Sequence, residues 1–335
     1  MGARGQELGG EGGVTVGALR PSGSSVSVAI LMGTFNGGKY LSEQLESIVR
    51  QVHGNWRLIA SDDGSTDNTV ALLERFQQVH GTAKVQIRRG PKSGFAQNFL
   101  AMACDSGIQA DYYAFCDQDD VWLPEKLQRT IERLESEAGK VADKQDCPLL
   151  YCGRTAYVRD DLQIYSHSPL FVFPCSFRNA LVQSIAGGNT MVFNQAVKTL
   201  LERTGRLPIS SHDWWIYQLI TGVGGRVFYD PQPLILYRQH EKALSGGNSS
   251  WSSKFSRLIR LLKGDFKLLL NRNSLCLDAV RPNLDGHALE VLNLFERMRK
   301  AKFKDRLRLF SVSGLYRQSL SGTLTLIFAL LVGKL

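Results

Sequence analysis

From residue 26 onward, the sequence alternates short runs of β-forming residues with stretches whose apolar residues recur at helical spacing. This alternation is typical of a mixed, mostly parallel sheet flanked by helices, and it predicts an α/β fold class. The β-forming runs predict strands at Val26–Met32, Arg57–Ser61, Val85–Arg89 and Tyr112–Cys116. The helical stretches are Leu41–Val52, Thr69–Val79, Phe95–Ser106 and Pro124–Glu137.

Polar side chains gather where three of these strands end. Thr34 and Asn36 follow the first strand, residues 62–67 follow the second, and residues 117–120 follow the fourth. Ligands of open α/β sheets bind beyond the carboxyl ends of the strands, and repeated strand–helix units of this kind bind nucleotides. We therefore expect these polar segments to meet in one nucleotide-binding site.

The segment Asp117-Gln118-Asp119-Asp120 carries three carboxylates within four residues. Carboxylates this close repel one another, and a divalent cation such as Mg²⁺ or Mn²⁺ relieves that repulsion. Such an ion commonly shares its remaining coordination positions with water and the phosphates of a substrate. The alternative is a solvated acidic turn that caps the following helix.

A second acidic segment, Ser61–Asp67, follows the second predicted strand. Asp63 could accept a hydrogen bond from a nucleobase or a ribose hydroxyl, while Ser65 or Asp67 could cap the next helix. By itself the segment is equally typical of a turn with a helix cap. Its pairing with the first acidic segment in one sheet favours the nucleotide site.

Three segments together closely resemble the family 2 glycosyltransferases of GT-A fold. They are Thr34–Leu41 (TFNGGKYL), Asp62–Asp67 (DDGSTD) and Phe115–Trp122 (FCDQDDVW). Within that family, the last segment is similar to the rhamnosyltransferase-like branch. The resemblance runs from about Val26 to Gly247, and the motifs occur in the family's order.

The resemblance implies a role for each matching residue. Thr34, Asn36, Asp63 and Asp117 would contact the nucleotide, with Asp63 at the base and Asp117 at the ribose or the metal. Asp119 would ligate the Mg²⁺ or Mn²⁺ ion, and His240 in Tyr237-Arg238-Gln239-His240 would complete the metal shell or touch the diphosphate.

The acceptor side is implied in the same way. The loop Gly187-Gly188-Asn189 and Trp214 would lie near the donor sugar and the acceptor, and Asp213 would be the catalytic base. A general base removes the proton from the attacking hydroxyl. The alternative makes Asp213 only the N-cap of a helix at Trp214–Ile220.

Most of the positive charge lies in the C-terminal part of the chain. Residues 251–335 hold sixteen Lys/Arg and six Asp/Glu, whereas the whole chain has a net charge of +9. Basic residues alternate there with Phe255, Leu258, Phe266, Leu270 and other apolar residues, which predicts amphipathic helices in peripheral contact with a membrane. The alternative is packing against the catalytic domain or a second subunit. The apolar run Leu324–Val332 is too short to span a bilayer.

These patterns predict three regions. Residues 1–25 form a flexible Gly/Ser-rich leader, residues 26–250 the catalytic domain, and residues 251–335 a basic helical extension. Within the catalytic domain, residues 26–120 are the expected nucleotide-binding half and residues 121–250 the acceptor half. Six cysteines without a CxxC pair indicate reduced thiols. We therefore expect a cytoplasmic protein, peripheral at the inner face of the plasma membrane.

The function predicted from the resemblance is that of an inverting, metal-dependent hexosyltransferase. It would move a sugar, rhamnose from dTDP-rhamnose as the leading candidate, to a hydroxyl of a lipid-linked or growing cell-surface polysaccharide. A haloacid-dehalogenase-type phosphatase is a second candidate, because such enzymes also use an Asp-x-Asp after an apolar strand. A non-catalytic binding protein with a basic membrane-binding or nucleic-acid-binding tail is a third. No nucleic-acid partner is expected, since the tail lacks an aromatic platform for base stacking.

Overall fold

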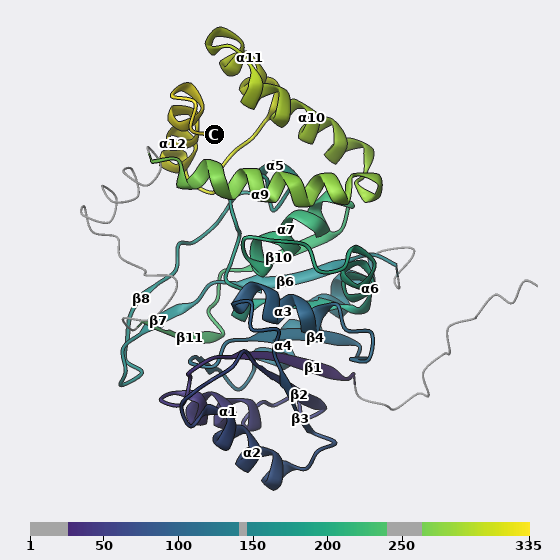
Figure 1. The fold of residues 1–335 in the computed structure, drawn as a ribbon, viewed down its shortest axis with the longest axis vertical. Coiled ribbons are helices and arrows are strands. Elements are labelled where there is room, and N and C mark those ends of the chain that lie inside the picture. Colours follow the sequence, from purple (N-terminus) through teal and green to yellow (C-terminus); the bar gives the residue numbers. More distant parts are fainter. Residues whose placement is uncertain (1–25, 141–145, 240–262) are drawn as a thin grey trace, which may run out of the picture.

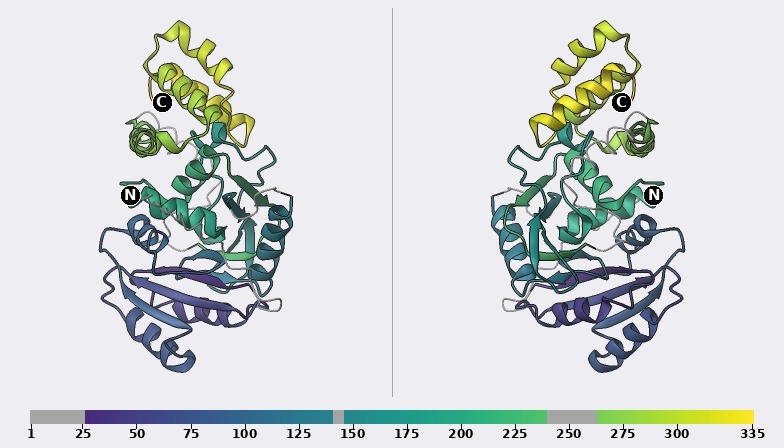
Figure 2. Two further views of the ribbon diagram at one scale, coloured as in Figure 1. Left: turned by 90° about the vertical axis from the view of Figure 1, so that its right-hand side faces the viewer. Right: turned by 90° about the vertical axis from the view of Figure 1, so that its left-hand side faces the viewer.

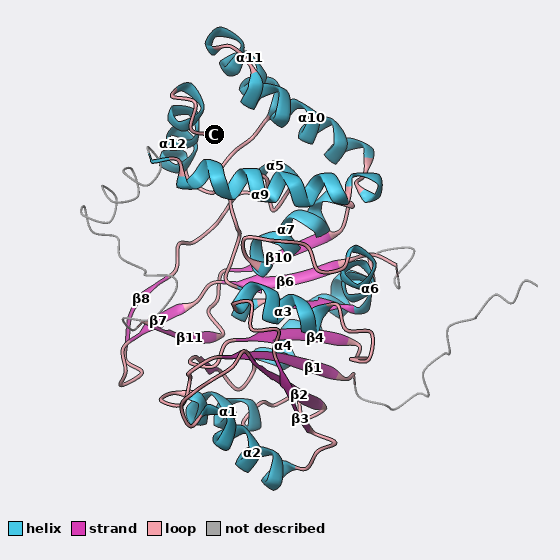
Figure 3. Ribbon diagram, viewed as in Figure 1, coloured by secondary structure: helices cyan, strands magenta, loops and turns pink. Residues whose placement is uncertain are grey.

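The computed structural model describes residues 26–140, 146–239 and 263–335 and centres on a seven-stranded, mostly parallel sheet (Figures 1 and 3). Its strand order is β10-β6-β9-β4-β1-β2-β3. The strands span β1 (Val28–Thr34), β2 (Trp56–Asp62), β3 (Val85–Arg89), β4 (Tyr112–Cys116), β6 (Leu149–Gly153), β9 (Val192–Asn194) and β10 (Arg226–Asp230). Only β9 runs antiparallel to its neighbours. The architecture is that of a GT-A-type α/β fold.

Helices cover both faces of this sheet, because side chains alternate between the faces along each strand. Ile30 of β1 packs in one core with residues of the helices on the first face, whereas Leu31 packs in the core on the opposite face. The first face carries α1 (Leu41–Val49), α2 (Thr69–His80) and α4 (Lys126–Ala138). The opposite face carries α3 (Phe95–Ala103), α6 (Gln195–Thr204) and α7 (His212–Gly222).

A second, four-stranded sheet lies beside the first, with the order β5-β11-β7-β8. It is built from β5 (Val121–Trp122), β7 (Ala156–Val158), β8 (Ile164–His167) and β11 (Ile235–Arg238). Because β5 follows the acidic segment directly and β11 pairs with it, this sheet brings residues near 238 close to residues near 120.

Four helices form the C-terminal part of the described chain, at the end of the molecule opposite α1 and α2 (Figures 1 and 2). They are α9 (Asp265–Ala279), α10 (Gly286–Lys300), α11 (Phe303–Ser313) and α12 (Leu320–Leu331). Phe295 of α10 and Leu330 of α12 are buried in the same core as α3 and α7, so these helices are packed onto the catalytic part of the chain. Within the described ranges, no helix has both the length and the apolar character that crossing a bilayer requires.

The predicted strands at Val85–Arg89 and Tyr112–Cys116 match β3 and β4 to the residue, and the other two strands shift by one or two residues. Residues 149–158 are divided between β6 and β7, which belong to different sheets, and the short helix α5 (Phe177–Ala180) follows farther along the chain. The predicted leader, residues 1–25, lies outside the described residues. So do Phe255 and Leu258 of the predicted membrane face, whereas Phe266 and Leu270 of that face pack against the core.

Candidate active site

The sheet order β4-β1-β2 places the carboxyl ends of three neighbouring parallel strands side by side. Thr34 stands opposite Asp62 in the register of β1 and β2, and its Oγ1 donates a hydrogen bond of 3.0 Å to Asp62 Oδ1. Asp62 also accepts from the backbone N–H groups of Gly64 and Ser65, at 3.1 and 2.8 Å. Thr34 therefore links the end of β1 to the DDGSTD segment that begins at Asp62.

Asn36 joins the loops that follow β1 and β2. Its backbone N–H donates to Ser65 Oγ and its Oδ1 accepts from the Thr66 N–H, both at 2.8 Å. Its φ of 49° lies in the left-handed region, which asparagine tolerates better than most residues. The predicted nucleotide-contacting residue thus also holds the two loops in register.

Asp63 supports a third loop. Its Oδ1 accepts from the Lys92 N–H at 2.6 Å and its Oδ2 from the Gly94 N–H at 2.9 Å. A carboxylate oxygen has more than one lone pair, so these bonds leave acceptor capacity for a ligand. The N-cap residue of α2 is Asn68, so neither Ser65 nor Asp67 holds the cap position expected from the sequence. Asp67 Oδ1 nevertheless accepts from the Thr69 N–H at 3.0 Å, at the first residue of α2.

Gln118, to which the sequence assigned no role, links the acidic segment to the loop after β1. Its Oε1 accepts from the Phe35 N–H at 2.8 Å, and its Nε2 donates to the Phe35 carbonyl at 2.9 Å. The side-chain amide thereby pairs with the backbone as a neighbouring strand would. A Cβ on Gly37 would lie 2.1 Å from the same Oε1, so the close approach requires glycine there. One feature of the sequence could have indicated this role, because Gln118 lies inside the acidic motif.

Asp117, Asp119 and Asp213 form one electrostatic cluster. Burial, followed by the negative charges of Asp119 and Asp213, raises the pKa of Asp117 to about 8. Their influence shows that the fold brings Asp213 of α7 to the end of β4. A bound cation would relieve this repulsion.

Asp120 points into the protein and holds the glycine loop. Its Oδ2 accepts from Asn189 Nδ2 at 2.5 Å, whereas its Oδ1 has no partner among the described residues. Burial, followed by the charges of Asp119 and Asp117, raises the pKa of Asp120 well above its usual range. Asp120 therefore positions the short 3₁₀ helix η1 (Gly188–Thr190), which follows Gly187, beside the acidic cluster.

Asp213 lies within the first turn of α7, which begins at His212 with Ser211 as the N-cap residue. The alternative that Asp213 is the N-cap of a helix starting at Trp214 is therefore wrong. Its Oδ1 accepts from the Trp214 N–H at 2.7 Å, and an acidic residue in the first turn interacts favourably with the helix dipole. Trp214 is buried, and its Nε1 donates to the Ala180 carbonyl at 2.7 Å.

His212, also missed by the sequence analysis, packs directly behind this site. Its ring stacks on Phe99 with centroids 4.2 Å apart and contacts the edge of Phe115 at 4.9 Å. Neither ring nitrogen has a partner among the residues that the structure describes. Burial lowers the pKa of His212 to about 4, so the imidazole is neutral at pH 7. Its neighbour Gly188 leaves room for the ring.

Arg238, in the segment that includes His240, is buried and connects three parts of the site. Its side chain donates to the Asp119 carbonyl at 3.2 Å, to the Asp160 carbonyl at 2.7 Å and to Glu43 Oε2 at 2.8 Å. It thus fixes the backbone of the acidic segment. His240 itself lies outside the described residues.

Hard carboxylate oxygens suit Mg²⁺ or Mn²⁺, and the neighbouring carboxylates of Asp117 and Asp119 are the candidate ligands of such an ion. Among the described residues, no group of three or more His, Cys, Asp or Glu side chains is arranged to hold an ion alone. This set fits an ion that takes one or two ligands from the protein and the rest from a substrate diphosphate and water.

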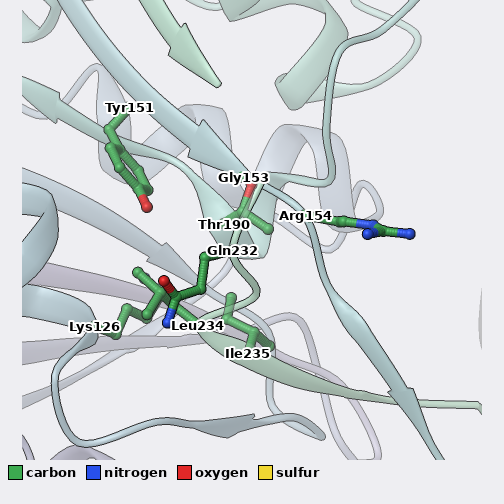
Figure 4. A pocket seen from close by; sticks show the side chains of 8 residues that line it. All are labelled: Lys126, Tyr151, Gly153, Arg154, Thr190, Gln232, Leu234 and Ile235. Carbon is green, nitrogen blue, oxygen red and sulfur yellow. The ribbon is translucent and has the colours of Figure 1, made fainter. Parts of the chain in front are cut away.

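A small pocket is lined by Thr190 of η1 and by residues of α4, β6 and β11 (Figure 4). Its empty volume, which includes the opening to solvent, is about 200 Å³. The residues that line it include Lys126, Tyr151, Thr190 and Gln232. Lys126 Nζ has no hydrogen-bond partner in the described part of the chain and lies 3.7 Å from the centroid of the Trp122 ring. Asp117, Asp119 and Asp213 do not line this pocket.

Comparison with known proteins agrees with this geometry. Residues 29–169 match the family model described as glycosyl transferase family 2. The dTDP-rhamnosyl transferase RfbG of Shigella flexneri is 29% identical over 237 residues, which cover 68% of this chain and 78% of that protein. The WfgD glucosyltransferase of Escherichia coli, which acts on α-D-GlcNAc-diphosphoundecaprenol, is 29% identical over 107 residues, or 32% of this chain and 40% of its own length.

Solved structures show the same fold. S. aureus TarS 1–349, determined in complex with UDP-GlcNAc, superposes with a TM-score of 0.51 at 12% sequence identity. The match covers 83% of this chain and 82% of the TarS chain. At this identity the likeness concerns the fold alone.

Proposed function

Because the chain carries a family 2 glycosyltransferase domain of GT-A fold and resembles rhamnosyltransferases, we propose that it transfers a sugar from a nucleotide-diphospho-sugar to a hydroxyl acceptor. The acceptor is a lipid-linked or growing cell-surface polysaccharide. One observation carries the proposal: the carboxyl ends of β1, β2 and β4 converge with the start of α7, which joins the nucleotide motifs to Asp213. A phosphatase of the haloacid-dehalogenase type is disfavoured, because its Asp-x-Asp follows the first strand and here the motif follows β4.

In this proposal the nucleotide lies along the strand ends. Asp63 accepts from the base, and Thr34 and Asn36 shape the pocket wall through their contacts with Asp62 and residues 65–66. Asp117 faces the ribose or the metal. The loop at Gly187–Asn189, held by Asp120, and the neighbouring Trp214 border the donor sugar and the acceptor.

Asp213 is the proposed general base. Its carboxylate removes the proton of the acceptor hydroxyl as that oxygen bonds to the anomeric carbon, while the bond from this carbon to the diphosphate oxygen breaks. With one base and no second carboxylate assigned as a nucleophile, the reaction is a single displacement that inverts the anomeric configuration. NMR of the product would contradict this mechanism if the donor's configuration were retained.

Asp119 and Asp117 would hold a Mg²⁺ or Mn²⁺ ion together with the diphosphate, and His240 is a further candidate ligand. When bound, such an ion would neutralise negative charge on the leaving diphosphate. We expect turnover to disappear in EDTA and to return with Mn²⁺ or Mg²⁺. Full turnover in the chelator would exclude the metal requirement.

dTDP-rhamnose is the proposed donor, supported by the similarity to RfbG. A panel of nucleotide sugars, assayed for donor hydrolysis and for transfer to lipid-diphosphate-linked glycans, tests this choice. The expected result is the highest kcat/KM with dTDP-rhamnose. A clear preference for a UDP-hexose would keep the glycosyltransferase function and overturn the donor.

A further inference from the structure

Helix α12 has an exposed apolar side. Leu320, Leu324, Phe328 and Val332 are 77%, 66%, 42% and 43% exposed. They follow one another at intervals of four residues, so they lie along one side of the helix. Leu326 and Leu330, on the other side, are buried in the core. An extended exposed apolar surface of this kind is uncommon on a protein that remains in water.

Helix α11 packs against α12 and carries further exposed apolar side chains. Phe303 and Leu307, four residues apart, are both exposed. Arg306 fixes α11 against α12, because its Nη1 donates to the Leu330 carbonyl and its Nε to the Ala301 carbonyl, each at 2.9 Å. We call the six side chains the C-terminal apolar face: Phe303, Leu307, Leu320, Leu324, Phe328 and Val332.

The charge around this face is almost entirely positive. Residues 297–335 contain nine Lys/Arg and one Asp/Glu, a net charge of +8. The remaining residues hold thirty-one Lys/Arg and thirty Asp/Glu, so they contribute only +1 of the total of +9. Lys304 and Arg308 of α11 are exposed, and so is its N-cap residue, Lys302. The apolar side chains thus stand among cations and not among mixed charges.

We propose that the C-terminal apolar face docks on an anionic lipid bilayer. Leucine and phenylalanine side chains enter the boundary between headgroups and acyl chains, and Lys302, Lys304 and Arg308 bind the anionic headgroups. A second copy of this chain fits the face less well, because it would bring the same positive charge to the interface. This docking does not depend on the proposed transferase activity.

The exposed apolar surface continues from α12 into the catalytic part of the chain. Leu170, Val172 and Phe173 are exposed, and the backbone of Phe173 exchanges two hydrogen bonds of 3.0 Å with the side chain of Gln318, just before α12. The loop after β8 therefore reaches the bilayer with the two helices. Under the proposed function, this orientation presents the acceptor half to lipid-linked glycans.

Flotation of the full chain with vesicles tests the proposal without an activity assay. We expect binding to vesicles of phosphatidylglycerol and phosphatidylcholine, and little binding to phosphatidylcholine alone. The triple variant Leu320→Ser/Leu324→Ser/Phe328→Ser should reduce partitioning about tenfold or more. Lys302→Gln/Lys304→Gln/Arg308→Gln should produce a comparable loss that high salt reproduces in the wild type.

Matched controls lie on elements other than α11 and α12. Val49→Ser/Val52→Ser/Val79→Ser removes three exposed apolar side chains near α1 and α2, and Arg50→Gln/Arg75→Gln/Arg203→Gln removes three exposed cations. Both should bind vesicles like the wild type, and all four variants should keep the wild-type circular dichroism and Tm.

Several results would overturn the proposal. They are wild-type chain that stays off anionic vesicles, equal losses in the control variants, or unchanged flotation in both test variants. If light scattering shows that the leucine variant turns a dimer into a monomer while flotation persists, the face belongs to a second copy. A further contradicting result would be that RNA displaces the chain fully from vesicles and that the leucine variant binds RNA as well as the wild type does. The basic surface would then belong to a polyanion.

Discussion

The Cβ that Gly188 lacks would lie 2.0 Å from Nε2 of His212, far inside contact distance. The imidazole cannot easily move away, because Phe99 stacks on one of its faces and Phe115 meets it edge to face. The glycine loop and the start of α7, which carries Asp213, are therefore packed together through one ring.

Gly188→Ala should destabilise the protein by about 1–3 kcal/mol, the usual cost of overpacking a rigid site, and should lower turnover. His212→Ala in the same chain makes room for the methyl group, so the double variant should lose less than the two single losses combined. Denaturant unfolding of the four proteins measures this coupling. Gly54→Ala is the control, because nothing lies within 4 Å of its Cβ position, and additive losses at 188 and 212 would show that the ring is not the obstacle.

The buried imidazole also predicts a pH dependence of stability. The folded pKa of His212 is about 4, below the value of 6.5 for a free histidine, so the unfolded chain binds the proton more tightly. The stability that neutral His212 confers is therefore complete above pH 6.5 and is lost as the pH falls towards 4, by roughly 3 kcal/mol at the end. His212→Leu should show a smaller loss over that range in urea unfolding, whereas His287→Leu, which removes an exposed imidazole, should behave like the wild type. Identical curves for the wild type and His212→Leu would contradict the prediction.

Asp213 and Asp119 should differ in what their amide variants lose. Asp213→Asn keeps an oxygen that can accept from the Trp214 N–H but cannot take a proton, so kcat should fall about 10²–10⁴-fold with little change in donor affinity. Asp119→Asn should weaken binding of the nucleotide diphosphate in the presence of Mn²⁺ as well as turnover, with partial rescue by excess Mn²⁺. Isothermal titration beside steady-state kinetics separates the two. Near-wild-type turnover in Asp213→Asn would remove this residue from the role of base.

Gln118→Glu tests the link between the acidic segment and the loop after β1. A carboxylate can still accept from the Phe35 N–H, but it cannot donate to the Phe35 carbonyl, and it adds negative charge beside Asp117 and Asp119. We expect a loss of about 1–3 kcal/mol in the free energy of unfolding and weaker nucleotide-diphosphate binding. Gln78→Glu, at an exposed amide of α2, should change neither quantity. An unchanged Tm and Kd in Gln118→Glu would show that the pairing is dispensable.

The sequence predicted the parts of the fold that local patterns encode. The continuous apolar run of β1 and the helical stripe after Leu41 depend only on neighbouring residues, and β3 and β4 were located to the residue. The acidic clusters were predicted at strand ends because motif and strand are adjacent in the chain. The family resemblance followed from the same short segments, as did the candidate roles of Thr34, Asp63 and Asp119.

Only the tertiary structure decided which of these segments meet. Asn189 bonds Asp120 across 69 residues of sequence, and Asp213 reaches Asp117 because α7 packs beside β4 in a sheet whose order no local pattern contains. The division of 149–158 between two sheets also depends on distant partners, since β6 pairs with β10 while β7 pairs with β11. The sequence did not reveal the exposed side of α12 either, because leucines occur on both sides of the helix and only packing against the core determines which of them face outward.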